Sequence, residues 1–233
     1  MRNELPNFAV LDKCGSNLKV LVRYSNKAKY ISIQIKFGIV ELVLPNKDFL
    51  TGYKFLLTKE SWIKHKLQNS TKQPPIDNKT IPIFDKTYSL LYIDADHHNI
   101  QIQNDVIHVY SRPGRHNGIL IGFLQNKLLS EITAIIIILS KQYKLNFTEI
   151  KIRDNKTKWG SCSNKSVLSF NWRLIFTPEE ILKYVIIHEM CHLLEMNHSQ
   201  RFWDLVEGLY PDYKSAKLWL KENGNRIYQY LKL

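Results

Sequence analysis

The amino-acid sequence predicts an α+β fold, because its front and rear parts carry different hydrophobic patterns. Up to residue 112, short segments rich in β-branched and aromatic residues alternate with turn-forming residues, which is typical of strands. From residue 113, apolar residues recur every three to four positions over longer segments, which indicates helices. We therefore expect a β-rich N-terminal region over residues 1–112 and a mainly helical region with a small sheet over residues 113–233. The two regions can also pack as one unit.

The N-terminal region is expected to hold two groups of strands separated by one helix. Strands are predicted at 20–24, 30–36 and 39–44, with Gly38 at the second turn, and the helix is predicted at 46–67. Lys72 to Lys79 then forms a polar, proline-bearing connector. Four further strands are predicted at 81–84, 88–93, 99–103 and 106–110.

The rear region begins after Ser111–Arg115, where proline and glycine interrupt the strand pattern. A long helix is predicted at 120–145, and its most apolar part, residues 132–140, is far shorter than the roughly 20 residues that span a bilayer. We expect this part to be a buried helix segment. Two strands are predicted next, at 147–153 and 167–172. A helix that carries the motif described below follows, and then two final helices at 199–209 and 213–223.

The segment His188-Glu189-Met190-Cys191-His192 predicts a metal site. On a helix, positions i and i+4 lie on one face, so the two imidazoles can hold one ion. Zn²⁺ binds imidazole nitrogen at about 2.0–2.1 Å and prefers tetrahedral coordination. Glu189 points close to the same face and can take a proton from a water on the open metal position.

The preceding residues predict where this helix begins. Thr177-Pro178-Glu179-Glu180 matches a capping box, with Thr177 as the N-cap and Pro178 as the first helical residue, and Asn197 is the expected end. The helix is apolar on most of its surface, which predicts burial. Buried polar groups need partners, and a metal ion satisfies both histidines together.

The third ligand is expected just after this helix. His198 follows His192 by six residues, across a predicted turn. Catalytic sites with three protein ligands leave the fourth position to water. We take His198 as the expected third ligand, with Glu195 and Glu207 as alternatives.

Composition predicts a cytoplasmic protein without a membrane partner. The N-terminal residues lack the apolar core of a secretory signal. Cys14, Cys162 and Cys191 form no C-x-x-C pair, so a disulfide framework is not expected and a reducing compartment is. The net charge of +12 allows nucleic-acid binding, but the Lys and Arg residues are scattered, so such binding is not indicated.

Two segments carry a resemblance to a known family. One runs from Lys158-Trp159-Gly160-Ser161-Cys162-Ser163 to Asn171-Trp172-Arg173-Leu174, and the other from His188 through Asn197-His198-Ser199 to Phe202-Trp203. With them, the chain resembles the YgjP-like zinc metallopeptidases, a bacterial group similar to the SprT/Spartan proteases and more distantly to other zincins. The resemblance implies a zincin-like fold, Zn²⁺ held by His188, His192 and His198, and Glu189 as general base.

Four residues are candidates for contact with substrate. Trp159, Gly160 and Ser161 are expected to line the cleft, where an extended strand can pair with a peptide backbone. Gly160 permits either the close approach of another chain or a tight turn packed by Trp159. Asn171 is a further candidate, with a role in a structural network as its alternative.

The predicted activity is hydrolysis of peptide bonds in a peptide or protein substrate by a zinc-dependent metallopeptidase. The alternatives are a non-proteolytic metal-dependent hydrolase, since a fold does not fix a function, and a DNA-associated SprT-like protease. An oxyanion stabiliser is expected, with Tyr210, Tyr213 and Arg201 as candidates.

Overall fold

The computed structural model describes residues 6–11, 18–36, 39–71 and 79–231. They belong to two compact units, Met1–Pro75 and Ile76–Leu233. The expected turn at Gly38, most of the connector at 72–79, and Cys14 lie outside the described residues.

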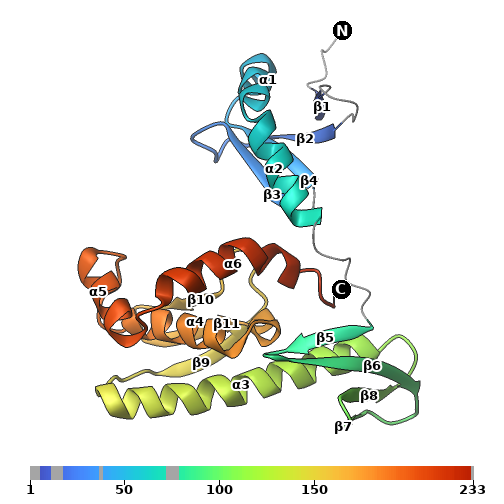
Figure 1. The fold of residues 1–233 in the computed structure, drawn as a ribbon, viewed down its shortest axis with the longest axis vertical. Coiled ribbons are helices and arrows are strands. Elements are labelled where there is room, and N and C mark those ends of the chain that lie inside the picture. The colour runs from blue at the N-terminus through green and yellow to red at the C-terminus, as the bar shows by residue number, and fades with distance from the viewer. Residues whose placement is uncertain (1–5, 12–17, 37–38, 72–78, 232–233) are drawn as a thin grey trace. The chain divides into compact units, whose positions relative to one another are not determined.

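The first unit is a four-stranded sheet covered by two helices (Figure 1). The strands are β1 (Phe8–Leu11), β2 (Leu18–Tyr24), β3 (Ser32–Lys36) and β4 (Ile39–Leu44), in the order β1-β2-β4-β3. β2 and β4 are parallel, and the outer pairs are antiparallel. Alternate strand residues face the core, which Leu56 and Ile63 from the helices complete.

The single helix expected at 46–67 is two helices in the structure. α1 (Phe49–Thr58) starts at Asp48, whose side chain accepts a hydrogen bond from Thr51 N. It ends at Lys59, and α2 (Glu60–Thr71) follows at once. Because the hydrophobic period hardly changes across this break, the sequence pattern does not reveal it. β1 was not expected either.

The second unit is built around α3 (His116–Tyr143), which runs along its length (Figure 1). One side of α3 contacts β8 (Val106–Ser111) and another part contacts β9 (Glu149–Arg153). Its fully buried residues follow helical spacing, at Leu120, Leu124, Leu128, Ile132 and Ile136. Within the segment 132–140 expected to be buried, Ile137 and Ile138 are exposed, so only one side of that segment faces the core.

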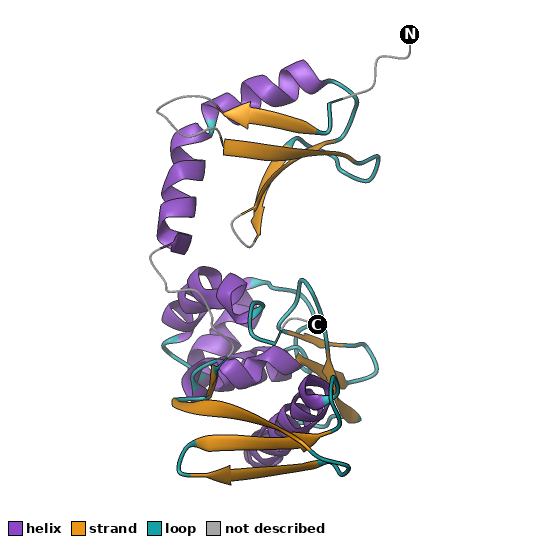
Figure 2. Ribbon diagram, turned by 90° about the vertical axis from the view of Figure 1, so that its right-hand side faces the viewer, coloured by secondary structure: helices purple, strands orange, loops and turns teal. Residues whose placement is uncertain are grey.

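Two sheets pack in this unit. β5 (Thr80–Ile83), β6 (Lys86–Asp94), β7 (Asn99–Gln103) and β8 form one sheet in the order β5-β6-β8-β7, seen in Figure 2. β9, β10 (Gly160–Cys162) and β11 (Val167–Asn171) form the other in the order β10-β11-β9, so β10 is an edge strand. After β11, a 3-10 helix η1 (Trp172–Phe176) leads into α4 (Glu179–Cys191), α5 (Gln200–Leu209) and α6 (Tyr213–Ile227).

The division between the units differs from the boundary expected after residue 112. The sheet β5–β8 belongs to the second unit, because Ile81, Ile83, Ile107 and Val109 share one core with α3 and α4. The proline and glycine near residue 113 mark a turn inside this unit. The predicted α+β arrangement, with strands in front and a mainly helical rear around a small sheet, is confirmed.

Among the described residues, α3 alone has the length and apolar composition of a membrane span. The core helix of a soluble protein meets the same criterion, and the apolar stripe of α3 is buried against β8, β9 and η1.

Candidate metal centre

Three histidines meet at the C-terminal end of α4. His188 lies in the last turn of the helix, and His192 caps it with helical backbone angles. The chain then turns back and places His198 just before α5. One ring nitrogen from each histidine lies within 4.8 Å of the other two, and the Nε2 atoms of His188 and His198 are 3.1 Å apart. Tetrahedral zinc ligands at 2.0–2.1 Å are separated from one another by about 3.3 Å, so this spacing suits a shared ion.

The protonation states of these rings also suit a metal. Burial, with the neighbouring His192, His198 and Lys217, lowers the pKa of His188 to about 3. Burial, His192 and Lys217 also lower the pKa of His198. A metal ligand must be a neutral imidazole, which these shifts favour. The Nδ1 atom of His192 lies 3.0 Å from the carbonyl oxygen of Glu195, which leaves its Nε2 free for an ion.

His188 Nδ1 is buried and has no hydrogen-bond partner within the described residues. The donor set, three clustered imidazoles, fits a divalent metal such as zinc. Glu195 and Glu207, the alternative third ligands, do not belong to this group. Glu207 instead approaches Lys214 at 3.5 Å.

The aromatic residues of α5 surround the three rings. Ser199 caps α5 by accepting a hydrogen bond from Phe202 N. Phe202 is fully buried and stacks on His192 with a centroid distance of 4.4 Å. Trp203 stacks on His198 at 5.6 Å. These contacts hold the third histidine in place.

Glu189 is a buried carboxylate beside the histidines. It is 5% exposed, and burial raises its pKa to about 8, an effect that Lys158 partly opposes. Its side chain lies directly on the backbone of Gly160: a Cβ built at Gly160 would be 2.5 Å from Glu189 Oε1. Gly160 lies in the extended strand β10 and has no positive φ, so close approach, and not a tight turn, explains the glycine.

A cavity of about 400 Å³ opens between α4 and β10. Its lining joins the three histidines and Glu189 to Lys158, Trp159, Gly160, Ser161, Cys162, Tyr184, Val185, Met196 and Leu220. Trp159, Gly160 and Ser161, the residues expected to line a cleft, thus line this cavity. Tyr184 received no role from the sequence, although its position, four residues before His188, was a usable signal.

Asn171 does not line the cavity. It is fully buried, and its Nδ2 donates to the carbonyl oxygens of Asn155 at 2.6 Å and Lys158 at 3.2 Å and to the Tyr228 hydroxyl at 2.8 Å. Its Oδ1 accepts a hydrogen bond from Arg173 N. Asn171 therefore fixes the loop that leads into β10, and the structure supports the structural alternative over direct contact with substrate.

The capping box expected for α4 is absent. The Thr177 hydroxyl instead donates a hydrogen bond to Leu174 O in η1. α4 starts at Glu179, and Pro178 at its N-cap position provides no side-chain hydrogen bond. Asp85, in the turn between β5 and β6, accepts a hydrogen bond from Glu179 N at 3.3 Å. The helix also ends at Cys191, earlier than the expected stop at Asn197.

The cysteines near the site differ in their surroundings. Cys191 is buried, and burial raises the pKa of its thiol to about 12, which fits a packing role. Cys162 lines the cavity, and burial together with Glu189 raises the pKa of its thiol. Neither thiol therefore has the low pKa of a reactive cysteine.

Of the comparisons with known proteins, one identifies a family. The family model described as YgjP-like, metallopeptidase domain, matches residues 29–223. No curated protein matches the chain. The solved metallopeptidase zymogens jannalysin of Methanocaldococcus jannaschii and abylysin of Pyrococcus abyssi are 24% and 23% identical to it, with TM-scores of 0.34 and 0.32. Their alignments cover 37% and 42% of this chain, and 90% and 93% of theirs.

The family match begins just before β3 and ends within α6, so it includes the whole histidine cluster. The chain therefore belongs to the YgjP-like family of metallopeptidases.

Proposed function

We propose that the protein is a zinc-dependent peptidase that cleaves peptide bonds with His188, His192 and His198 as metal ligands and Glu189 as general base. The observation that carries the proposal is the convergence of three imidazoles beside a buried carboxylate in one cavity. Zinc, if held by these three residues, would supply Lewis acidity, which lowers the pKa of water toward about 7 and polarises a carbonyl group.

The chain's own residues supply the proton transfer. Glu189 must accept the proton of the attacking water and then donate it to the leaving amine. Burial disfavours the charged carboxylate, and Lys158 favours it. Gly160 leaves the space in which Glu189 lies, so the carboxylate stays in the cavity beside the histidines.

The edge strand β10 supports a peptide as substrate. Among the described strands, β10 pairs with β11 alone, and its residues Gly160, Ser161 and Cys162 line the cavity. An extended peptide can add to such an edge through backbone hydrogen bonds. A small ester or amide offers no backbone for this pairing, which favours a peptidase over a non-proteolytic hydrolase.

The test combines metal content with activity. The purified protein should contain one zinc per chain and should cleave members of a peptide library, and a chelator should abolish cleavage until zinc is returned. His188→Ala and His192→Ala should lose both zinc and activity. Stoichiometric zinc in both variants, or cleavage by the fully chelated protein, would refute the proposal.

A further inference from the structure

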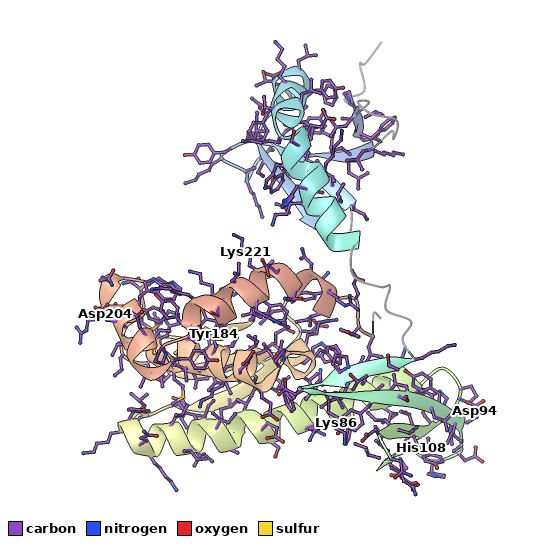
Figure 3. The ribbon with its side chains drawn as sticks, in the orientation of Figure 1. Lys86, Asp94, His108, Tyr184, Asp204 and Lys221 are labelled. Carbon is purple, nitrogen blue, oxygen red and sulfur yellow. The ribbon has the colours of Figure 1, made fainter. Side chains whose placement is uncertain are left out.

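The cavity contains a hydroxyl group that the proposed reaction has not yet used. Tyr184 lies on α4, four residues before His188, and is labelled in Figure 3. Its ring meets the His188 ring edge-on at a centroid distance of 5.8 Å, and the side chain lines the cavity. The residue is 5% exposed, so most of its ring is held in the core.

The ring of Tyr184 is held by aromatic neighbours, but its hydroxyl is free. The Tyr210 ring packs against the Tyr184 ring at a centroid distance of 6.0 Å. Within the described part of the chain, the Tyr184 hydroxyl makes no hydrogen bond, and it is not sealed from solvent. A buried tyrosine usually finds a partner for its hydroxyl. A fixed donor that opens into a cavity without a partner is suited to a group of the substrate.

The other donors around the cavity fit this role less well. The Trp159 ring packs on Tyr228 at 5.3 Å, and its indole lies over Gly224. A Cβ at Gly160 would point toward Glu189. Because successive side chains of a strand point to opposite faces, the Ser161 side chain lies on the other face of β10. The Cys162 thiol is a weak donor and contacts its neighbour Ser163 O at 3.6 Å. Lys158 is an exposed, flexible ammonium group.

The residues named as candidates from the sequence alone lie outside the lining. Tyr210 donates its hydroxyl proton to Glu180 O at 3.1 Å. Tyr213 stacks on Trp203 at 5.4 Å. Arg201 is exposed on α5 and does not line the cavity. Of these three residues and Tyr184, Tyr184 alone lines the cavity.

We propose that Tyr184 is a catalytic residue whose hydroxyl donates a hydrogen bond to the carbonyl oxygen of the scissile peptide as that oxygen becomes an oxyanion. The inference rests on the proposed peptidase function. No covalent bond forms at Tyr184, and burial raises the pKa of its phenol to about 12, so the phenol keeps its proton throughout. A donor of this kind binds the transition state more tightly than the substrate, so it acts on kcat and leaves KM almost unchanged.

The test uses Tyr184→Phe, which removes the hydroxyl and keeps the ring. We expect kcat to fall roughly 10²-fold, the size of effect seen when one oxyanion donor is lost, with KM within about twofold. Tyr210→Phe is the matched control, because it removes a hydroxyl from the neighbouring ring outside the cavity, and its kcat should stay within about twofold. Lys158→Met tests the competing donor and should lower kcat less than Tyr184→Phe does.

Two readouts separate a catalytic role from a structural one. Zinc content, and the absorption spectrum of the cobalt-substituted protein, should be the same in Tyr184→Phe as in the wild type. A tetrahedral phosphinic pseudopeptide should bind Tyr184→Phe with an affinity lowered by nearly the same factor as kcat. The intact peptide should bind equally to Glu189→Gln and to Glu189→Gln/Tyr184→Phe, both measured by calorimetry.

The outcomes distinguish the two proposals. If the wild type cleaves peptides and Tyr184→Phe cleaves them equally well, the role of Tyr184 is wrong and the peptidase function stands. An altered cobalt spectrum, or weaker binding of the intact peptide, would make Tyr184 a positioning residue and overturn the assignment. A zinc-loaded wild type that cleaves no peptide would overturn both proposals.

Discussion

Gly160 and Glu189 are in direct contact across the cavity wall: the backbone of an edge strand touches the carboxylate of the metal-site helix. No side chain larger than hydrogen fits at position 160, since a Cβ there would lie 2.5–2.7 Å from three atoms of the Glu189 side chain. The strand and the helix therefore jointly determine where the proposed general base lies. This contact gives the first prediction.

Gly160→Ala should lower kcat at least tenfold while zinc content stays at one per chain. The added methyl group must push Glu189 away from its place, because the atoms it meets belong to a buried side chain. A displaced base transfers protons poorly even when the metal is bound. Gly122→Ala on α3 is the control, because a Cβ there meets nothing within 4 Å. Equal kcat values for the two variants would show that Glu189 tolerates the shift.

Glu189→Ala should retain stoichiometric zinc and lose peptidase activity by several orders of magnitude. Glu189 is not one of the three clustered ligands, so its removal leaves the imidazoles intact. The reaction loses the group that accepts the proton of the water. Zinc analysis beside a peptide-cleavage assay checks both parts. Cleavage at the wild-type rate would assign the base to another residue.

Asn171→Ala should destabilise the protein by about 2 kcal/mol or more, because it leaves buried backbone groups without partners. The variant loses the bonds from Nδ2 to Asn155 O and Lys158 O, and the bond from Arg173 N to Oδ1. The free energy of unfolding from urea titration measures this loss. Gln200→Ala, which removes an exposed hydrogen bond from Gln200 Nε2 to Asp204 Oδ1 on α5, should cost clearly less. A direct substrate contact would instead change KM without changing stability.

In the metal-free protein, His188 should stay neutral far below the pH at which a histidine usually titrates. Its folded-state pKa of about 3 lies below the unfolded value of 6.5, so the unfolded chain takes up the proton first. The stability that this group contributes is present above pH 6.5 and is lost as the pH falls toward 3. NMR titration of the His188 ring in the chelated protein measures the pKa. An ordinary value would mean that the ring is solvated when the metal is absent.

The sequence was informative where a local pattern determines the geometry. His188 and His192 come together because helical spacing puts positions i and i+4 on one face. The neighbouring His198 follows within a short turn, and the structure places it next to both. Strands 99–103 and 106–110 were likewise readable from alternation, and they appear as β7 and β8.

Features that depend on distant segments were not readable. The cap of α4 comes from Asp85, 94 residues before Glu179 in the chain, so the nearby Thr177 was a false signal. Asn171 looked like a cleft residue because it lies close to Trp159 in the sequence, yet its side chain turns inward to the loop at 155–158. Tyr184 is an exception: its position four residues before His188 was a local signal, but a tyrosine in an apolar helix is usually part of the core.

The hydrogen bond from Glu179 to Asp85 has a practical consequence for anyone who shortens this chain. A second bond, from Phe84 N to Ile175 O at 2.9 Å, ties the same hairpin to η1. A fragment that starts at residue 113 would keep all three proposed metal ligands. It would lack the hairpin that is bonded to the start of α4, and Leu120 and Leu124 of the shared core would become exposed to water. Such a truncation should express as aggregates, whereas a cut near residue 76 spares the hairpin.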